Sequence, residues 1–514
     1  MAEDYSRKWV VAGTVMIGNI MAVLDSSIVN VALPNMAGNM GATVEEITWV
    51  VTGYILANVL IMPIVGMLSA RFGRKHLYML SIAVFTGASM LCGMAKSLEE
   101  MVAFRMLQGL AGGVLVTVPQ AILRESFPPM EQGVAMGVYG MGVVLAPAIG
   151  PTLGGWLTDQ YSWPWVFFIN VPVGILNLFM VQRIIHDPPY LERRRGKMDL
   201  AGLGFMIAGL GAFQLMLEEG ERENWFDSSL ITRLAVLAAV GIALFVWREV
   251  TTERPAVDIA LLKNVRFTAA TVLGGVMGAG LSGTLFILPL FLQNLLGYDA
   301  MDSGLAMMPR SLAMLVMMPL AGRMYNRAGP RLLTAGGIVF LAAGYWDLSH
   351  LTVETSAWDL VFPQVLMGIG ASLLFAALST AALAAIPRER MTAATGLYNV
   401  VRQVMGSIGI AVVATLLTHS QARYHAILAE DTATPIARDW VAALAARMHQ
   451  LGTDAITAEH RALALLNMKI TRQAMVLAYN HIFFLGAAVF VVVFPLVFLL
   501  QRSAHTGEVE VMAE

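Results

Sequence analysis

The sequence contains a single cysteine, Cys92, and few charged residues. One thiol excludes both a disulfide framework and a thiolate metal site. Charged residues make up 13% of the 514 residues and hydrophobic residues 57%, whereas a soluble domain carries about 25% charge. The net charge of -2 indicates no nucleic-acid partner. Because apolar stretches recur along the chain without a polar block long enough for a soluble domain, the composition predicts a multi-pass membrane protein.

Motifs for enzymatic chemistry are also missing. The sequence has no GxxxxGK[ST] phosphate-binding loop, so ATP bound to this chain is not expected to drive its activity. Its nine histidines form no HExxH or other metal-ligand spacing. The segment Gly278–Gly283 matches GxGxxG, but it lies in an apolar run without a preceding strand, which favours helix packing over dinucleotide binding. We therefore expect no metal site and no enzyme.

Fourteen apolar stretches are long enough to cross a bilayer, which requires about 20 residues. The first follows Arg7 and Lys8, but it is longer than the apolar part of a signal peptide and is expected to remain in the protein. Lysine and arginine are concentrated in the segments that would lie on the same side as the N-terminus. The positive-inside rule therefore places both termini in the cytoplasm.

A sequence repeat relates the two halves of the chain. Met62–Lys75 recurs 256 residues later as Met318–Arg331, with Met, Pro, Gly, Arg and Gly at matching positions. A weaker echo places Gln364 where the first half has Arg105. Parallel repeats of this kind enclose a site near the middle of the membrane in transporters. We predict an all-α membrane protein with six-helix bundles at residues 1–185 and 263–514, separated by a segment at 186–262 with two extra spans at about 200–217 and 230–247.

Asp25 is the only carboxylate that lies well inside a predicted span. Burying a charge in hydrocarbon is costly, so such residues are usually functional. Helix geometry places Asp25 about 24 Å along the first span and Arg105 about 6 Å below the outer surface, so the two can share a depth. An apolar site favours the neutral acid and a nearby arginine favours the carboxylate, which would let Asp25 bind and release a proton. The alternative is a structural role, in which Asp25 holds the first helix through Arg105 or Ser26.

Two further segments predict a hinge and a gate that move during function. Within the fifth span, Gly133–Leu157, the stretch Ala146–Gly155 carries prolines and glycines at four-residue spacing, which predicts a bent, closely packed hinge. The glycines alone also fit a generic helix contact. The basic loop after the second span recurs in the second half, which favours a paired cytoplasmic gate over simple positive-inside anchors. The hinge residues are Pro147, Gly150, Pro151, Gly154 and Gly155, and the gate residues are Gly66, Arg71, Gly73, Arg74, Lys75, Arg327 and Arg331.

Taken together, these motifs resemble the major facilitator superfamily, in particular its fourteen-span drug:proton antiporter branch of the EmrB and QacA type. The resemblance covers nearly the whole chain. Ala70 stands where the loop motif usually has aspartate, so the usual charge relay at that gate is in doubt, and Ala146 replaces the first glycine of the antiporter motif. The matching segments are the first-helix motif Leu24–Pro34, the loop Gly66–Lys75, the span-four motif Arg105–Gly113, the antiporter motif Ala146–Gly155 and the branch-typical run Trp165–Pro172.

The resemblance implies proton-driven export of hydrophobic compounds by alternating access, with Asp25 and Arg105 in proton coupling and no cofactor besides protons. Proteins of the EmrB type work in the bacterial inner membrane with a periplasmic adaptor and an outer-membrane channel, whereas the QacA type works alone; we expect the former. An interior with one carboxylate and several arginines, Arg310 among them, favours neutral or anionic lipophiles over dications. The residues expected to line the substrate cavity are Asn19, Asn58, Gln120, Gln364, Asn399 and Arg402.

Alternatives remain at this stage. The chain fits a proton-coupled importer of a specific solute less well, because of its antiporter motif, and a membrane sensor less well, because it has no soluble output domain. The long outer segment at 418–473 is a candidate docking or lid element. Its one-sided apolar stripe more often indicates packing on the protein itself or at the lipid interface. The stripe consists of Trp440, Val441, Leu444, Ala445 and Met448.

Overall fold

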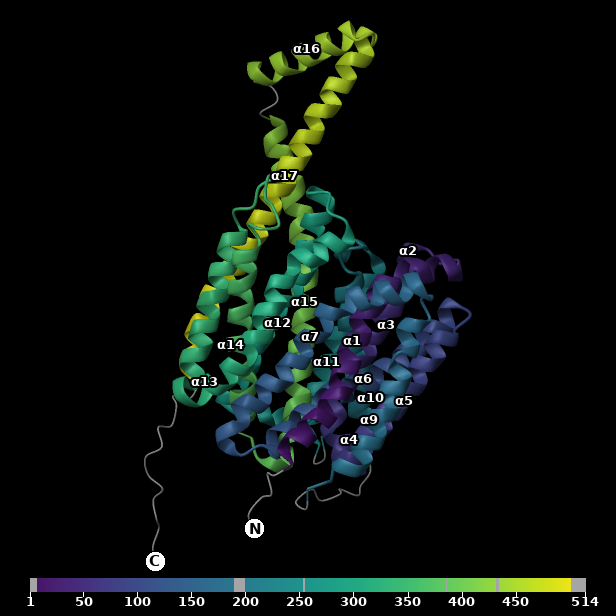
Figure 1. Cartoon of the computed structure of the whole chain (residues 1–514), viewed down its shortest axis with the longest axis vertical. Coiled ribbons are helices and arrows are strands. Elements are labelled where there is room, and N and C mark those ends of the chain that lie inside the picture. The colour runs from purple at the N-terminus through teal and green to yellow at the C-terminus, as the bar shows by residue number, and fades with distance from the viewer. Residues whose placement is uncertain (1–6, 189–198, 253–254, 385, 431–433, 501–514) are drawn as a thin grey trace, which may run out of the picture.

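The computed structural model describes residues 7–188, 199–252, 255–384, 386–430 and 434–500, and these residues form helices and connecting loops without strands. Most helices run lengthwise through the molecule (Figure 1). The first and last described residues lie at the same end, which we call the termini end. Two long helices project from the opposite end, which we call the stalk end. The predicted all-α architecture is confirmed.

The first half of the chain forms one group of membrane helices. Their starts follow local signals, as at Ser97, whose side chain accepts a hydrogen bond from the Glu100 amide and caps the fourth span. Two short helices, α2 (Val44–Ile47) and α8 (Trp165–Phe168), precede longer ones. The long elements are α1 (Lys8–Met40), α3 (Trp49–Ile61) with α4 (Val65–Phe72), α5 (Arg74–Met94), α6 (Leu98–Ser126), α7 (Gln132–Gln160) and α9 (Asn170–Ile184).

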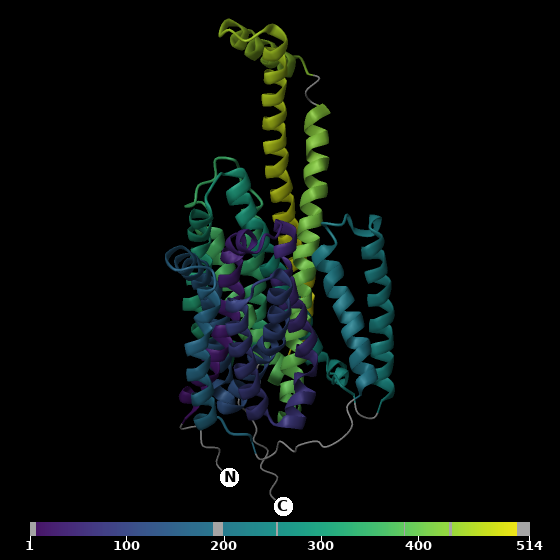
Figure 2. The same cartoon turned by 90° about the vertical axis from the view of Figure 1, so that its right-hand side faces the viewer.

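The two extra spans are α10 (Leu200–Glu219) and α11 (Ser229–Thr251), which stand at the edge of the molecule (Figure 2). They pack closely, because a Cβ placed on Gly209 would lie 2.5 Å from the Ile242 backbone nitrogen. Helix α10 also contacts α3 in the first half and the second half of the chain, where Gln214 Nε2 donates to Ser407 Oγ at 2.8 Å. The insert therefore bridges both halves. The domain boundaries at 185 and 262 stay a prediction.

The second half contains α12 (Val265–Leu290), α13 (Ala300–Leu348), α14 (Val361–Ala384), α15 (Met391–Glu430) and α17 (Ala455–Val493). Helix α13 holds two spans, because Gly329 interrupts it with a φ of +76°. Gly73 has the same left-handed backbone, with a φ of +86°, between the second and third spans. Only glycine adopts this conformation readily. The two copies of the predicted repeat therefore share a backbone conformation. Among the described residues, thirteen helices are long and apolar enough to cross a membrane, and because α13 holds two spans they match the fourteen predicted spans.

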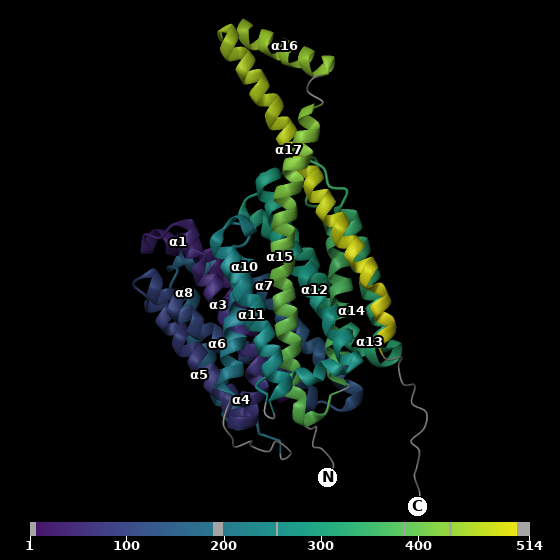
Figure 3. The ribbon, with the colours of Figure 1, turned by 180° about the vertical axis from the view of Figure 1, so that it is seen from behind.

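The last two spans are longer than predicted and build the stalk (Figure 3). Helix α15 continues well beyond residue 417, where its span was predicted to end, and α17 starts well before residue 474, where its span was predicted to begin. Helix α16 (Pro435–Gln450) lies across their outer ends. The continuation is rich in alanine and leucine, which favour helix even outside the membrane. The apolar stripe of α16 packs on α17, with Lys469 Nζ 4.6 Å from the Trp440 ring centroid. The stripe thus makes an internal contact, which is the interpretation that the sequence favours over partner docking.

The two halves approach each other most closely near the termini end. A Cβ on Gly66 would lie 2.6 Å from the Ala393 Cα, and one on Gly137 would lie 2.8 Å from the Met318 carbonyl oxygen. A Cβ on Gly133 would overlap the backbone of Gly322. Such backbone approaches exclude any passage between them. The molecule is therefore closed between its halves at the termini end.

Candidate functional site

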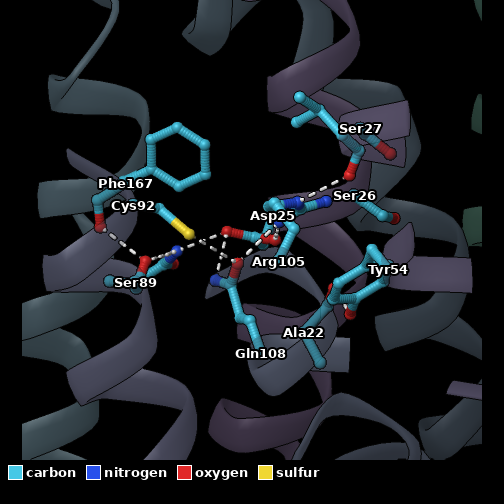
Figure 4. Close-up of polar contacts among 12 residues, drawn as sticks. Ala22, Asp25, Ser26, Ser27, Tyr54, Ser89, Cys92, Arg105, Gln108 and Phe167 are labelled. Carbon is cyan, nitrogen blue, oxygen red and sulfur yellow. Dashed lines mark hydrogen bonds and ion pairs between the residues drawn. The ribbon is translucent and has the colours of Figure 1, made fainter. Parts of the chain in front are cut away.

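Asp25 on α1 and Arg105 on α6 form a buried ion pair (Figure 4). Arg105 Nη1 lies 2.6 Å from Asp25 Oδ2, and both side chains are about 1% exposed. The predicted proximity of these two residues is confirmed. The pair holds together two helices that are far apart in the sequence, within the first half of the chain.

Two amide side chains complete the surroundings of the Asp25 carboxylate. Gln108 Nε2 donates to Asp25 Oδ1 at 2.9 Å, and Asn170 Nδ2 donates to the same oxygen at 2.8 Å. Asn170 also contacts Ser89 Oγ at 3.0 Å. Both carboxylate oxygens therefore accept N–H donors, and this arrangement fits the ionised acid. A proton on Asp25 would remove its attraction for Arg105 and at least one of these hydrogen bonds.

Arg105 is fixed independently of Asp25. Its Nε donates to the Val50 carbonyl oxygen at 3.1 Å, and its guanidinium lies 4.3 Å from the Tyr54 ring centroid. Helices α3 and α6 lie close enough for these contacts because Gly112 has no side chain. A Cβ on Gly112 would lie 2.6 Å from the Tyr54 hydroxyl oxygen. Loss of the Asp25 charge would therefore leave the guanidinium in place, held by α3.

The proposed hinge motif packs directly beside Asp25. A Cβ on Gly150 would lie 2.5 Å from the Ser27 Cβ, and one on Gly154 would lie 2.9 Å from the Ile28 carbonyl oxygen. Ser27 and Ile28 follow Asp25 by two and three residues. Helix α7 continues through Pro147 and Pro151, and Gly155 is partly exposed beside α1. Movement of α1 would thus be transmitted to α7, although the bend itself stays a prediction.

A second polar cluster joins the two halves. Asn399 Nδ2 on α15 donates to Gln120 Oε1 on α6 at 2.7 Å, and Arg402 Nη2 lies 3.4 Å from Asn399 Oδ1. The Arg402 guanidinium lies 5.7 Å from the ring centroid of Phe375, which stacks on Tyr139 from the first half. These residues contact each other across the interface between the halves. They combine aromatic surface with polar groups, as sites for organic molecules commonly do.

The other predicted cavity residues lie in separate places. Asn19 is buried near Gly142 of α7, and neither of its amide atoms is hydrogen-bonded within the described part of the chain. Asn58 of α3 lies beside Gly112 of α6. Gln364 is buried on α14 with neither amide atom hydrogen-bonded among the described residues. The six predicted residues thus do not form one cluster. Gln120, Asn399 and Arg402 are brought together, and the other three are not.

The basic residues of the predicted gate bind mainly within their own halves. Arg74 Nη1 lies 2.5 Å from Glu125 Oε2, and Lys75 Nζ donates to the Gln182 carbonyl oxygen at 2.7 Å. Arg331 Nη2 donates to the Leu500 carbonyl oxygen at 2.9 Å. Arg71 and Arg327 are exposed. Contact between the halves is instead made by small residues, including Gly66 of the motif.

Sequence reasoning missed Asn170, Ser89 and Tyr54 as parts of the Asp25 site. Asn170 lies in the run Trp165–Pro172, where a polar residue among apolar ones was the available signal. The hydroxyls of serine and tyrosine give no such signal, because they occur throughout membrane helices. Among the described residues, no three His, Cys, Asp or Glu side chains lie together in a way that would hold a metal ion.

Comparison with known proteins identifies the family. Residues 15–410 match the family model of the Major Facilitator Superfamily. The chain is 35% identical to the fatty acid resistance protein FarB of Neisseria gonorrhoeae, over 95% of each chain. It is 33% identical to the multidrug export protein EmrB of Escherichia coli K12, over 96% of this chain and 95% of that protein.

A solved structure agrees on the fold. The human organic anion transporter MFSD10 matches with a TM-score of 0.63 at 13% identity, covering 95% of this chain and 99% of that one. Such low identity shows a shared fold alone. Together with the family match, it accounts for the paired bundles and the repeated glycine at 73 and 329. The chain belongs to the Major Facilitator Superfamily, among the transporters related to EmrB and FarB, and is a membrane transporter rather than an enzyme.

Proposed function

We propose that the protein is a proton-driven exporter of hydrophobic compounds, in a bacterial inner membrane, with both termini in the cytoplasm. The observation that carries the proposal is the buried pair of Asp25 and Arg105, packed against the glycines of the antiporter motif. The printed names of relatives, a multidrug export protein and a fatty acid resistance protein, support a substrate class of lipophilic compounds. The proton is the coupling ion, and no other cofactor is required.

In the proposed cycle, Asp25 exchanges a proton while the cavity between the halves changes sides. Protonation removes the charge that holds α1 to Arg105 and weakens the bonds to Gln108 and Asn170. Because Gly150 and Gly154 pack on α1, the loosened helix alters the position of α7, which closes the termini side through Gly133 and Gly137. Proton uptake is thereby linked to opening toward the cytoplasm, where a new substrate enters. Release of that proton restores the ion pair.

The test uses inverted membrane vesicles that contain the full chain. An imposed proton gradient, acidic inside, should drive uptake of a lipophilic fluorescent substrate, and an uncoupler should abolish that uptake. Vesicles without the protein provide the control. Uptake that ignores the uncoupler would contradict proton coupling, and the absence of any uptake across a panel of lipophilic compounds would contradict export itself.

We further propose that the stalk docks a periplasmic adaptor, which joins the exporter to an outer-membrane channel. The stalk projects from the end opposite the termini (Figure 1). The turn between α16 and α17 exposes large apolar side chains, with Leu451 81% and Ile456 70% exposed, and Ile436 at the other end of α16 is 81% exposed. Exposed apolar residues on a projecting element are typical of protein contact sites.

The adaptor contact is tested by adding charge at the tip. Leu451→Glu combined with Ile456→Glu should abolish resistance of intact cells to an exported compound, because an anchor side chain contributes about 2 kcal/mol or more. Uptake by inverted vesicles should be unchanged, since transport across the inner membrane needs no adaptor. Ala422→Glu, on the side of the stalk, is the matched control. Unchanged resistance in the double variant would refute docking at the tip.

A further inference from the structure

Arg310 in the second half is a buried cation without a counter-charge. Its side chain is 4% exposed, and its Nη1 has no hydrogen-bond partner among the described residues. No ion pair to Arg310 is formed in the described part of the chain, and its ionisable neighbour is the Tyr345 phenol. The Tyr345 hydroxyl is already bound, at 2.6 Å to the Gly280 carbonyl oxygen and at 2.5 Å to Thr284 Oγ1.

An unpaired charge at this depth carries a penalty of several kcal/mol. Arginine does not relieve the penalty by losing its proton, because the guanidinium stays charged in proteins. A protein that retains such a residue therefore gains from an anion that binds beside it. Because no acidic side chain of the described residues pairs with Arg310, such an anion would be a bound ligand.

The repeat shows what the first half has at the corresponding place. Counted back by 256 residues, Arg310 corresponds to Tyr54, Tyr345 to Ser89 and Leu281 to Asp25. Tyr54 and Ser89 belong to the surroundings of the Asp25 pair. In the second half the arginine, Arg310, lies on the helix that corresponds to α3 instead of α6, and Leu281 occupies the position of Asp25. The two halves thus carry related clusters, of which only the first contains its own carboxylate.

A neutral donor group lies near Arg310. Gln364 is fully buried, and neither its Nε2 nor its Oε1 is hydrogen-bonded among the described residues. One turn further along α14, a Cβ on Gly368 would lie 2.6 Å from the Arg310 carbonyl oxygen. Residues four apart share a helix face, so Gln364 lies on the face of α14 that meets Arg310. An amide N–H and a guanidinium are the donors that bind a carboxylate.

We propose that Arg310 and Gln364 form a binding site for the carboxylate of an amphipathic organic anion. The inference rests on the proposed export function and names a substrate class for it. The site lies close to the interface between the halves, because Met318, two turns from Arg310 on the same helix, contacts Gly140 of the opposite half. In the proposed cycle the substrate reaches the site when the halves separate. The acyl chain of such a substrate then meets methionine side chains, while its head group neutralises the cation.

The experiment measures binding to the full-length protein in nanodiscs by calorimetry, without a proton gradient. The probes are laurate and methyl laurate, which share an acyl chain and differ in charge. We expect laurate to bind about tenfold more tightly, since a charge-assisted contact contributes about 1.5 kcal/mol or more. Arg310→Gln and Gln364→Leu should each reduce this preference, whereas Arg310→Lys should retain most of it. Arg233→Gln, which changes an exposed arginine, is the control.

Three results would overturn the assignment. The first is equal binding of laurate and its ester by the native protein, and the second is an intact preference in Arg310→Gln. The third is Arg310-dependent binding of chloride, titrated against gluconate, without competition from laurate, which would identify an inorganic anion site. Failure of the proton-coupling proposal is separable, because binding requires no gradient. Gradient-driven uptake of a neutral lipophilic dye by the native protein tests coupling on its own.

Discussion

Replacing Asp25 with asparagine is expected to abolish uphill export while leaving substrate binding in place. Asparagine accepts hydrogen bonds from Gln108 and Asn170 but takes up no proton, so the cycle loses its coupling step. A proton gradient equivalent to about 150 mV supplies about 3.5 kcal/mol, which corresponds to a few hundredfold in substrate concentration. That accumulation ratio, measured in inverted vesicles, should fall to about one.

The substitution also leaves Arg105 without its counter-charge, which costs about 3–5 kcal/mol when one partner of a buried pair is removed. A second variant separates folding from coupling. Asp25→Asn combined with Arg105→Gln removes both charges, and it should recover thermal stability without recovering uphill transport. Asp25→Glu retains a titratable group and should keep part of the activity. Accumulation at the native level by Asp25→Asn would refute the coupling role.

Part of this site follows from the sequence. The depth of Asp25 and Arg105 was calculable from helix rise, because membrane spans have fixed direction and length. The position of Asn170 was not calculable in this way. Its approach to Asp25 depends on the rotation of the sixth span, α9, about its own axis, and that rotation is set by packing. The same reason explains why Gln120 and Asn399 meet although Asn19 and Gln364 remain apart from them.

The fold shows a similar division. The number of spans and the repeated glycine at 73 and 329 could be predicted from the sequence. The length of an apolar stretch indicates a span, and a position with positive φ is usually occupied by glycine. The stalk was not recognised as a continuation of the last two spans. Hydropathy marks where the membrane ends, whereas a helix ends only where its backbone hydrogen bonding does. Helices α15 and α17 pass that boundary because their outer parts also favour helix.

Adding one methyl group at Gly133 is expected to shift the protein away from the closed arrangement of its termini side. A Cβ there overlaps the Gly322 backbone, which has no flexible end to move aside. Overpacking of this kind costs about 1–3 kcal/mol, so the closed state of Gly133→Ala should lose about tenfold or more in population. Gly87→Ala adds the same atom where no atom lies within 4 Å, and it should behave as the native protein does.

The shift is measurable by labelling a buried residue of the closed contact. In a Cys92→Ala background, Met318→Cys introduces a single thiol at a position that is fully buried between the halves. A membrane-impermeant maleimide added to inverted vesicles reaches this thiol only when the termini side opens. Labelling should be about tenfold faster with Gly133→Ala than with Gly87→Ala. Equal rates would mean that closure does not depend on this backbone contact, and the link from Asp25 through α1 and α7 to the termini side would lose its last step.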